Sequence, residues 1–310
     1  MFSKTSSHPS AAITIIILLL AISLSLSFSA CKRGGGENGG SGGAGESGSS
    51  GGSSDSDPGD GGGAGTDTPG GAGDSADPEA LWYYEEERAE RYAAFAQIRP
   101  DLTMEDVVWM VDCDLDLPPY EDTHEVPDPN SLTLLVNKHF GLPQDYVPAD
   151  LISVGSAQMR SESAAALNAL ISDAEGQGLG IWAQSGFRAY GIQQSLYNNY
   201  AATDGQAAAD TYSARPGFSE HQTGLTVDLN DITDAFGQRP EGIWVKEHAW
   251  EYGFIIRYTE ENQSITLYVR EPWHLRYIGR EHAEAMRDLG FTSFEEYWAK
   301  YIKHAPSAVG

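Results

Sequence analysis

The stretch from residue 34 to about residue 76 limits how much of this chain can fold. Glycine, serine and aspartate make up most of it, and apolar residues are few. Such a segment cannot bury enough apolar surface to offset the entropy lost when it becomes ordered. We therefore predict a flexible, disordered tether over residues 31–77, spanning roughly 35–40 Å. Residues 78–305 remain for one folded domain with a sizeable core.

The residues before the tether have the pattern of an export signal. A lysine near the start is followed by an apolar run at 11–26 and then by small residues. Phe-Ser-Ala-Cys at 28–31 resembles a bacterial lipobox, in which the cysteine is diacylated and becomes the mature N-terminus. We expect a lipoprotein signal peptide over 1–30, a lipid on Cys31, and an exported protein anchored to a membrane at the cell envelope, in the periplasm or on the outer face. Plain cleavage near Ala30 and an uncleaved anchor are the alternatives, and both also export the protein.

Charge and cysteine content argue against two classes of function. The net charge of −26 argues against nucleic acid as a partner, because phosphate binding needs clusters of lysine and arginine. If Cys31 carries lipid, Cys113 has no partner for an intramolecular disulfide. Cys113 lies in an apolar run, which favours a buried structural thiol over a nucleophile.

The folded part mixes helices and short strands without a regular alternation, which indicates the α+β class. Composition, capping residues and apolar spacing predict helices at about 78–98, 161–175, 191–200, 241–252, 280–289 and 293–302. They predict strands at about 107–111, 181–184, 225–229, 254–258 and 265–269, with another short apolar run at 131–137.

Two short motifs carry the residues for a metal site. Ser-Glu-His-Gln-Thr-Gly-Leu-Thr-Val-Asp occupies 219–228, and Glu-Pro-Trp-His occupies 271–274. They supply two imidazoles and a carboxylate, from His221, His274 and Asp228. This donor set suits one Zn²⁺ ion with three protein ligands and a fourth position left to water. The absence of thiol ligands argues against a structural zinc knuckle.

The residues between His221 and Asp228 predict how these two ligands meet. Gly224 is followed by a β-favouring run, so a turn and then a strand fit better than one continuous helix. That turn can bring Asp228 back beside His221, while His274 must come from another strand of the sheet.

Glu271 is the candidate general base. A carboxylate that does not ligate the metal can take a proton from water at the open position. Pro272 restricts the backbone of Glu271, which favours a fixed orientation over an ordinary surface glutamate.

Several ordered motifs together resemble the VanY-type D-alanyl-D-alanine carboxypeptidases. These belong to the zinc DD-peptidase family, with VanX dipeptidases and pneumococcal-type LD-carboxypeptidases. The resemblance covers about 130–305 and, more weakly, begins near 105. It implies an antiparallel sheet flanked by helices, of the kind shared with the Hedgehog signalling domain, and zinc bound by His221, Asp228 and His274 with Glu271 as base. The motifs that carry it are Ser-Gly-Phe-Arg at 185–188, Gln193, Ser-Glu-His-Gln-Thr-Gly at 219–224, Asp228, the run from His248 to Tyr258, and Glu-Pro-Trp-His-Leu-Arg-Tyr at 271–277.

The same resemblance implies roles for three further residues. Arg188 would stabilise negative charge on the scissile carbonyl oxygen, which is physically sensible because a fixed cation in a dry site strongly favours developing charge. Gln193 and Ser219 would line the substrate pocket.

The expected function is a zinc metallopeptidase that hydrolyses the terminal D-Ala-D-Ala bond of peptidoglycan stem peptides, acting as a monomer. An LD-carboxypeptidase that trims tetrapeptide stems is an alternative, because the motifs around the metal occur in both kinds. An endopeptidase that cuts cross-links also stays open. A non-catalytic wall-binding module is a third alternative, and Glu271 argues against it because a binder needs no base beside an open metal position.

Overall fold

The computed structural model describes residues 78–304. The expected signal peptide, the lipidation site Cys31 and the tether over 31–77 lie outside these residues. Among the helices of the described part, none has the length and apolar character needed to cross a membrane.

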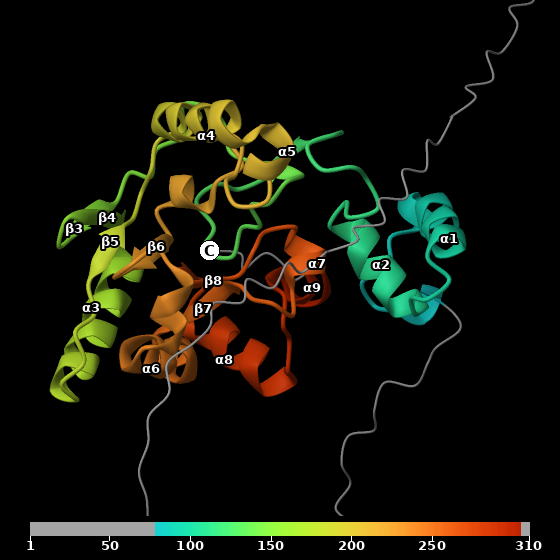
Figure 1. Cartoon of the computed structure of the whole chain (residues 1–310). Helices are drawn as coiled ribbons and strands as arrows, with labels where there is room; N and C mark the ends of the chain where they lie inside the picture. The colour runs from blue at the N-terminus through green and yellow to red at the C-terminus, as the bar shows by residue number, and fades with distance from the viewer. Residues whose placement is uncertain (1–77, 305–310) are drawn as a thin grey trace, which may run out of the picture. The chain divides into compact units, whose positions relative to one another are not determined.

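A four-stranded antiparallel sheet forms the centre of the domain (Figure 1). Its strand order is β5 (Ala183–Ser185), β6 (Thr226–Leu229), β8 (Glu271–Tyr277) and β7 (Phe254–Tyr258). β6 and most of β8 are buried, as expected for central strands. The strands predicted at 225–229 and 254–258 are confirmed as β6 and β7, and the strand predicted at 181–184 differs from β5 by two residues at its start and one at its end.

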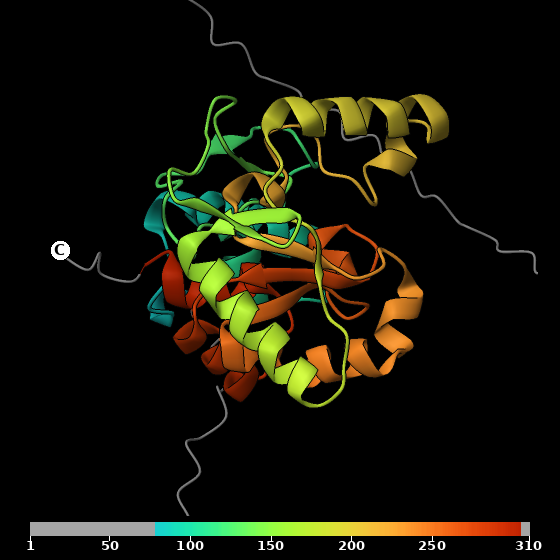
Figure 2. The same ribbon diagram turned by 90° about the vertical axis from the view of Figure 1, so that its left-hand side faces the viewer.

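Helices cover the two sides of this sheet unequally. α3 (Ser161–Gly176), α6 (Pro240–His248) and α8 (Arg280–Leu289) lie on one side, and α4 (Tyr190–Asp204) with α5 (Gln206–Ala209) lies on the other (Figures 1 and 2). Because successive side chains of a strand alternate between faces, Val227, Leu229 and Leu275 are fully buried in the core while Asp228 and His274 project from the opposite face. The α+β class and the antiparallel sheet flanked by helices are confirmed.

The first described residues pack against the end of the domain. They form η1 (Pro78–Ala80), η2 (Glu86–Arg88), α1 (Ala89–Ile98) and α2 (Met104–Asp112), and α2 contacts α9 (Phe294–Tyr297) and the π-helical turn η6 (Trp298–Ile302). The single helix expected over 78–98 is therefore broken into three pieces.

The strand expected at 107–111 is wrong, because these residues lie within α2. Thr103 and Asp106 form a capping box that starts the helix, since the hydroxyl of Thr103 accepts from the backbone of Asp106 and the Asp106 carboxylate accepts from the backbone of Thr103. Cys113 ends the helix and is fully buried, as predicted for a structural thiol.

The strand expected at 265–269 is also wrong. Residues 263–266 form the short helix α7 (Gln263–Thr266), which follows reciprocal hydrogen bonds between Thr259 and Asn262. Leu267, with a φ of 58°, adopts the left-handed conformation and ends it. The apolar run at 131–137 is buried at Leu134, Leu135 and Val136 without forming a strand.

Within residues 78–304, four short strands lie outside the central sheet and were not predicted. β3 (Leu151–Val154) and β4 (Ala157–Arg160) form an antiparallel hairpin, and β1 (His124–Glu125) pairs with β2 (Phe140–Gly141) in parallel. The 3₁₀ segments η3 (Glu220–Thr223), η4 (Asp234–Gln238) and η5 (Ala249–Tyr252) complete the fold.

Candidate active site

Strand register places two of the predicted ligands side by side. Asp228 on β6 is the cross-strand partner of His274 on β8. His221 reaches them from η3, because Gly224 ends η3 in the left-handed conformation with a φ of 69°. The left-handed conformation favours glycine at 224, and a Cβ there would lie 2.9 Å from Cδ2 of Leu151, so a larger residue would also have to displace that leucine. The predicted turn at Gly224 is confirmed.

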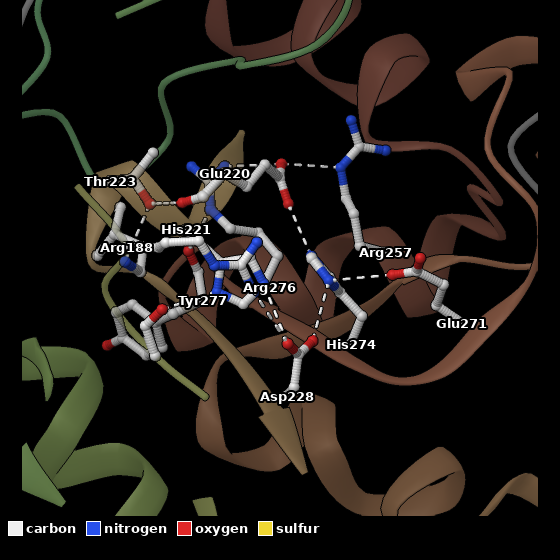
Figure 3. A network of polar contacts seen from close by, with 12 residues as sticks. Arg188, Glu220, His221, Thr223, Asp228, Arg257, Glu271, His274, Arg276 and Tyr277 are labelled. Atoms are coloured by element: carbon white, nitrogen blue, oxygen red, sulfur yellow. Dashed lines mark hydrogen bonds and ion pairs between the residues drawn. The ribbon is translucent and has the colours of Figure 1, made fainter. Parts of the chain in front are cut away.

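The three side chains have the spacing of ligands around one small cation. Nε2 of His221 lies 3.2 Å from Oδ2 of Asp228, and Nδ1 of His274 lies 3.3 Å from Oδ1 of Asp228. Ligand atoms of all three lie within 4.8 Å of one another (Figure 3). Tetrahedral zinc with bonds of about 2.0–2.1 Å separates its ligand atoms by about 3.3 Å. The donor set and its spacing therefore fit Zn²⁺.

Each imidazole has a partner that sets which nitrogen faces Asp228. Nδ1 of His221 lies 2.7 Å from the carbonyl oxygen of Gly186, so Nδ1 carries the proton and donates it. Nε2 of His274 lies 3.4 Å from Oε2 of Glu220, which leaves Nδ1 of that ring toward Asp228. Outer partners of this kind fix the ring orientation and tautomer of metal-binding histidines.

Glu220 is the centre of a buried ionic network behind His274. Its Oε1 accepts hydrogen bonds from Nε of Arg257 and Nη1 of Arg276, each at 2.9 Å. Nη1 of Arg257 also donates to Oε2 of Glu295 at 3.0 Å. Burial opposes ionisation of Glu220, but the charges of Arg257 and Arg276 outweigh burial and hold the pKa of its carboxyl far below the usual value.

Glu220 was not predicted to have a role, although it precedes the predicted ligand His221 within the motif at 219–224. The two arginines that hold it also lie within quoted motifs, at Arg257 and Arg276. A buried glutamate needs a cationic partner, so those two arginines were the available signal.

Glu271 lies at the start of β8 beside the cluster, where the base was predicted. Its Oε2 is 3.2 Å from Nδ1 of His274, and its side chain is 13% exposed. Figure 3 shows Glu271 and Asp228 approaching His274 from different directions. The carboxylate can therefore meet water at the site.

Arg188 brings a positive charge to the other side of Asp228. Its Nη2 lies 3.8 Å from Oδ2 of Asp228 and 3.3 Å from the hydroxyl oxygen of Ser185, to which it donates. Its Nη1 donates to Oε1 of Gln193 at 2.7 Å. Burial lowers the pKa of the Arg188 guanidinium, and the charge of Asp228 opposes that shift. An arginine remains a cation under these conditions.

Gln193 and Ser219, expected to contact substrate, are both buried. The amide of Gln193 accepts from Arg188 and donates to the carbonyl oxygen of Ala214 at 2.6 Å, so it holds Arg188 in place. Ser219 immediately precedes η3, and its side chain makes no capping hydrogen bond. The substrate contacts of these two residues stay predictions.

An aromatic wall beside His274 was not predicted. The ring centroid of Tyr258 lies 4.8 Å from that of His274, and the Tyr268 ring lies 4.9 Å from Tyr258. The buried ammonium of Lys138 lies 3.8 Å from the centroid of Tyr268 and donates to the carbonyl oxygen of Asp210. Lys138 thereby connects this wall to the segment that follows α5.

Comparisons with known proteins agree on one family. Residues 156–280 match the family model described as VanY, D-alanyl-D-alanine carboxypeptidase. YodJ of Bacillus subtilis (strain 168), which is named as a carboxypeptidase, is 35% identical over 204 residues, covering 61% of this chain and 74% of YodJ. A D-alanyl-D-alanine carboxypeptidase of Enterococcus faecalis is 31% identical over 213 residues, covering 58% of this chain and 78% of the relative.

A solved structure supports the same assignment. The LdcB LD-carboxypeptidase, described with the molecular basis of its peptidoglycan recognition, superposes with a TM-score of 0.55 at 34% identity. The match covers 59% of this chain and 93% of LdcB.

Proposed function

The chain belongs to the VanY family of D-alanyl-D-alanine carboxypeptidases, and we propose that it removes the terminal D-alanine from peptidoglycan stem peptides that end in D-Ala-D-Ala. The chain is a zinc metallopeptidase. The observation that carries the proposed reaction is the pair of groups around the ligand cluster, with Glu271 on one side and Arg188 on another.

His221, Asp228 and His274 would hold the one Zn²⁺ cofactor. When bound, zinc supplies a Lewis acid that makes water acidic near neutral pH and polarises a carbonyl group. The buried environment of the three side chains strengthens this effect because water does not screen it.

Glu271 performs the proton transfers. It takes one proton from the attacking water and gives one to the departing amine, so that the products are a shortened peptide and free D-alanine. Its partial exposure lets water reach it, while its position at the start of a paired strand fixes its direction.

Arg188 stabilises the negative charge that develops on the scissile carbonyl oxygen. Gln193 and Ser185 hold two of its nitrogens, so the guanidinium is oriented before the substrate arrives. Removal of a fixed donor of this kind lowers kcat about 10²- to 10³-fold.

Removal of D-alanine from tetrapeptide stems is the second candidate, because the LdcB structure is that of an LD-carboxypeptidase. Purified full-length protein should be incubated with defined pentapeptide and tetrapeptide stems, and the products weighed by mass spectrometry. Loss of one alanine from the pentapeptide supports the proposal, and loss only from the tetrapeptide favours the LD alternative. Cleavage of a cross-linked dimer would indicate an endopeptidase, and zinc binding without any product would indicate a wall-binding module.

The same assay tests the metal. Thorough chelation should abolish turnover, and added Zn²⁺ should restore it. Full activity in protein shown to be free of metal would contradict the zinc mechanism.

We also propose that the domain acts outside the cytoplasm as a monomer tethered to a membrane. The apolar run at 11–26 and the lipobox-like residues ending in Cys31 support this location. Cys31→Ser should abolish labelling by a radioactive fatty acid and shift the protein from the membrane fraction to the soluble fraction. A variant that stays labelled and membrane-bound would contradict lipid attachment at Cys31.

A further inference from the structure

An open hollow of about 470 Å³ lies where β5 begins and β6 ends. The proposed hydrolysis uses none of its residues. Trp182 is its largest side chain and is 48% exposed. The hollow is lined by Trp182, Gln184, Asn230, Asp231, Ile232, Thr233 and Arg239.

The hollow is close to the ligand cluster along the sheet. Asn230 follows Asp228 by two residues, and its backbone donates to the carbonyl oxygen of Trp182 at 3.1 Å. At about 3.3 Å per strand residue and about 4.8 Å between neighbouring strands, this places the backbone of Trp182 about 8 Å from that of Asp228. Ala183 is buried and pairs with Leu229, so the alternation of side chains directs Trp182 toward the face that carries Asp228.

The backbone that carries the exposed indole is held in place, and one side-chain hydrogen bond orients the ring. Oδ1 of Asn230 accepts from the backbone of Trp182 at 3.1 Å, and Nδ2 of Asn230 donates to the carbonyl oxygen of Gly180 at 2.7 Å. The indole Nε1 donates to Oε1 of Gln184 at 3.3 Å. Asn230 itself is buried and adopts a left-handed conformation with a φ of 46°. A binding group supported in this way loses little freedom when a ligand arrives.

The surroundings of the indole match a saccharide. A sugar ring presents an apolar C–H face and a rim of hydroxyl and amide groups, and an exposed aromatic ring beside polar side chains complements both. Gln184 and Thr233 supply donors and acceptors, and the ion pair of Asp231 with Arg239 remains about half exposed. Ile232, 51% exposed, adds an apolar surface that an N-acetyl methyl group can contact.

We propose that this hollow binds the N-acetylated sugar to which the stem peptide is attached, so that the enzyme recognises the glycan strand together with the peptide. This inference rests on the proposed function. About four residues separate the scissile bond from the sugar, and when extended they span at most about 13–14 Å. The Trp182 backbone, about 8 Å from that of Asp228, and the indole beyond it lie within that reach.

The test compares one stem pentapeptide in two forms, free and joined to its N-acetylglucosamine–N-acetylmuramic acid disaccharide. For the full-length wild type, kcat/KM should be higher for the disaccharide form. Trp182→Ala should lower the ratio of the two kcat/KM values about 5- to 10-fold, the size of one aromatic stacking contact. Trp182→Phe keeps an aromatic face and should retain most of the ratio. An unchanged ratio in Trp182→Ala, or an equal loss in both aromatic and alanine variants, would overturn the proposal.

A binding measurement separates this proposal from the proposed function. Tri-N-acetylglucosamine should change the tryptophan fluorescence of the wild type and of Glu271→Gln, and it should not do so in Trp182→Ala. If the wild type cleaves neither pentapeptide but retains this saccharide response, the proposed function fails and the saccharide site stands. If cleavage occurs and no response to the saccharide is seen in any variant, the saccharide site fails alone.

Discussion

Glu220 and His274 meet on the side of the imidazole that faces away from Asp228. Oε2 of Glu220 lies 3.4 Å from Nε2 of the ring, while Nδ1 lies 3.3 Å from Asp228. Because Arg257 and Arg276 keep Glu220 ionised, the ring has a fixed anionic partner behind it. The orientation of a proposed ligand therefore depends on residues that do not reach the metal position.

Glu220→Gln should weaken zinc binding about 10- to 100-fold, because an amide is a poorer partner for the outer nitrogen of His274. Affinity can be measured by competition with a chromophoric chelator, at a temperature where circular dichroism shows the variant folded. Glu175→Gln, an exposed change on α3, is the matched control and should bind zinc normally. Wild-type affinity in folded Glu220→Gln would show that the 3.4 Å contact has no role in orienting the ring.

Glu271→Gln should lower kcat about 10²- to 10⁴-fold while the zinc content stays near one ion per chain. The amide keeps the shape of the side chain but cannot accept the water proton. Stopped assays on the pentapeptide and metal analysis of the same preparation measure the two quantities, with Glu175→Gln again as control. Unchanged turnover with zinc bound would remove Glu271 from the mechanism.

Gln193→Ala distinguishes two roles for this buried amide. If Gln193 holds Arg188, its loss should lower kcat by less than Arg188→Lys does, since the guanidinium is present but poorly fixed. Arg188→Lys should lower kcat about 10²- to 10³-fold, because an ammonium cannot reproduce the fork that meets Gln193 and Ser185. A raised KM with unchanged kcat in Gln193→Ala would instead indicate the direct substrate contact expected from sequence.

The site was predictable because its chemistry is local in sequence. Gly224 predicts the turn between His221 and Asp228, and the β-favouring residues that follow it predict the strand β6. Glu271 lies three residues before His274 on β8, and an irregularity in the pairing of β8 with β7 interrupts the strand alternation between them, so both side chains reach the site. The Glu220 network was not predictable in the same way, since Arg257, Arg276 and Glu295 come from segments that only the folded chain brings together.

The two strands that were wrongly predicted, at 107–111 and 265–269, contain helices because of capping and burial. Val107, Val108 and Val111 are β-branched, yet the capping box at Thr103 starts a helix whose buried face they form. Tertiary burial and capping outweighed intrinsic β preference there. At 263–266 the paired side chains of Thr259 and Asn262 start a helical turn that composition alone does not indicate.

Lys138 gives a stability prediction with a defined pH window. Burial lowers the pKa of its ammonium from 10.5 to about 8, although the charge of Asp210 opposes that shift. Between these two values the unfolded chain binds more protons than the folded chain, so the contribution of Lys138 to the free energy of unfolding rises with pH. Between pH 8 and pH 10.5, the free energy of unfolding of the wild type should therefore rise by up to about 3 kcal/mol relative to that of Lys138→Met.

Urea unfolding of both proteins across this pH range measures the difference between their free energies of unfolding. Groups that titrate in both proteins contribute equally to the two values and cancel in this difference. Lys246→Met, which alters an exposed lysine on α6, is the matched control and should track the wild type at every pH. A difference between wild type and Lys138→Met that is flat with pH would contradict a buried, titrating ammonium over Tyr268. If the free energy of unfolding of the wild type minus that of Lys138→Met falls as the pH rises, the sign is the opposite of the one predicted. The folded protein would then favour the charged form of Lys138.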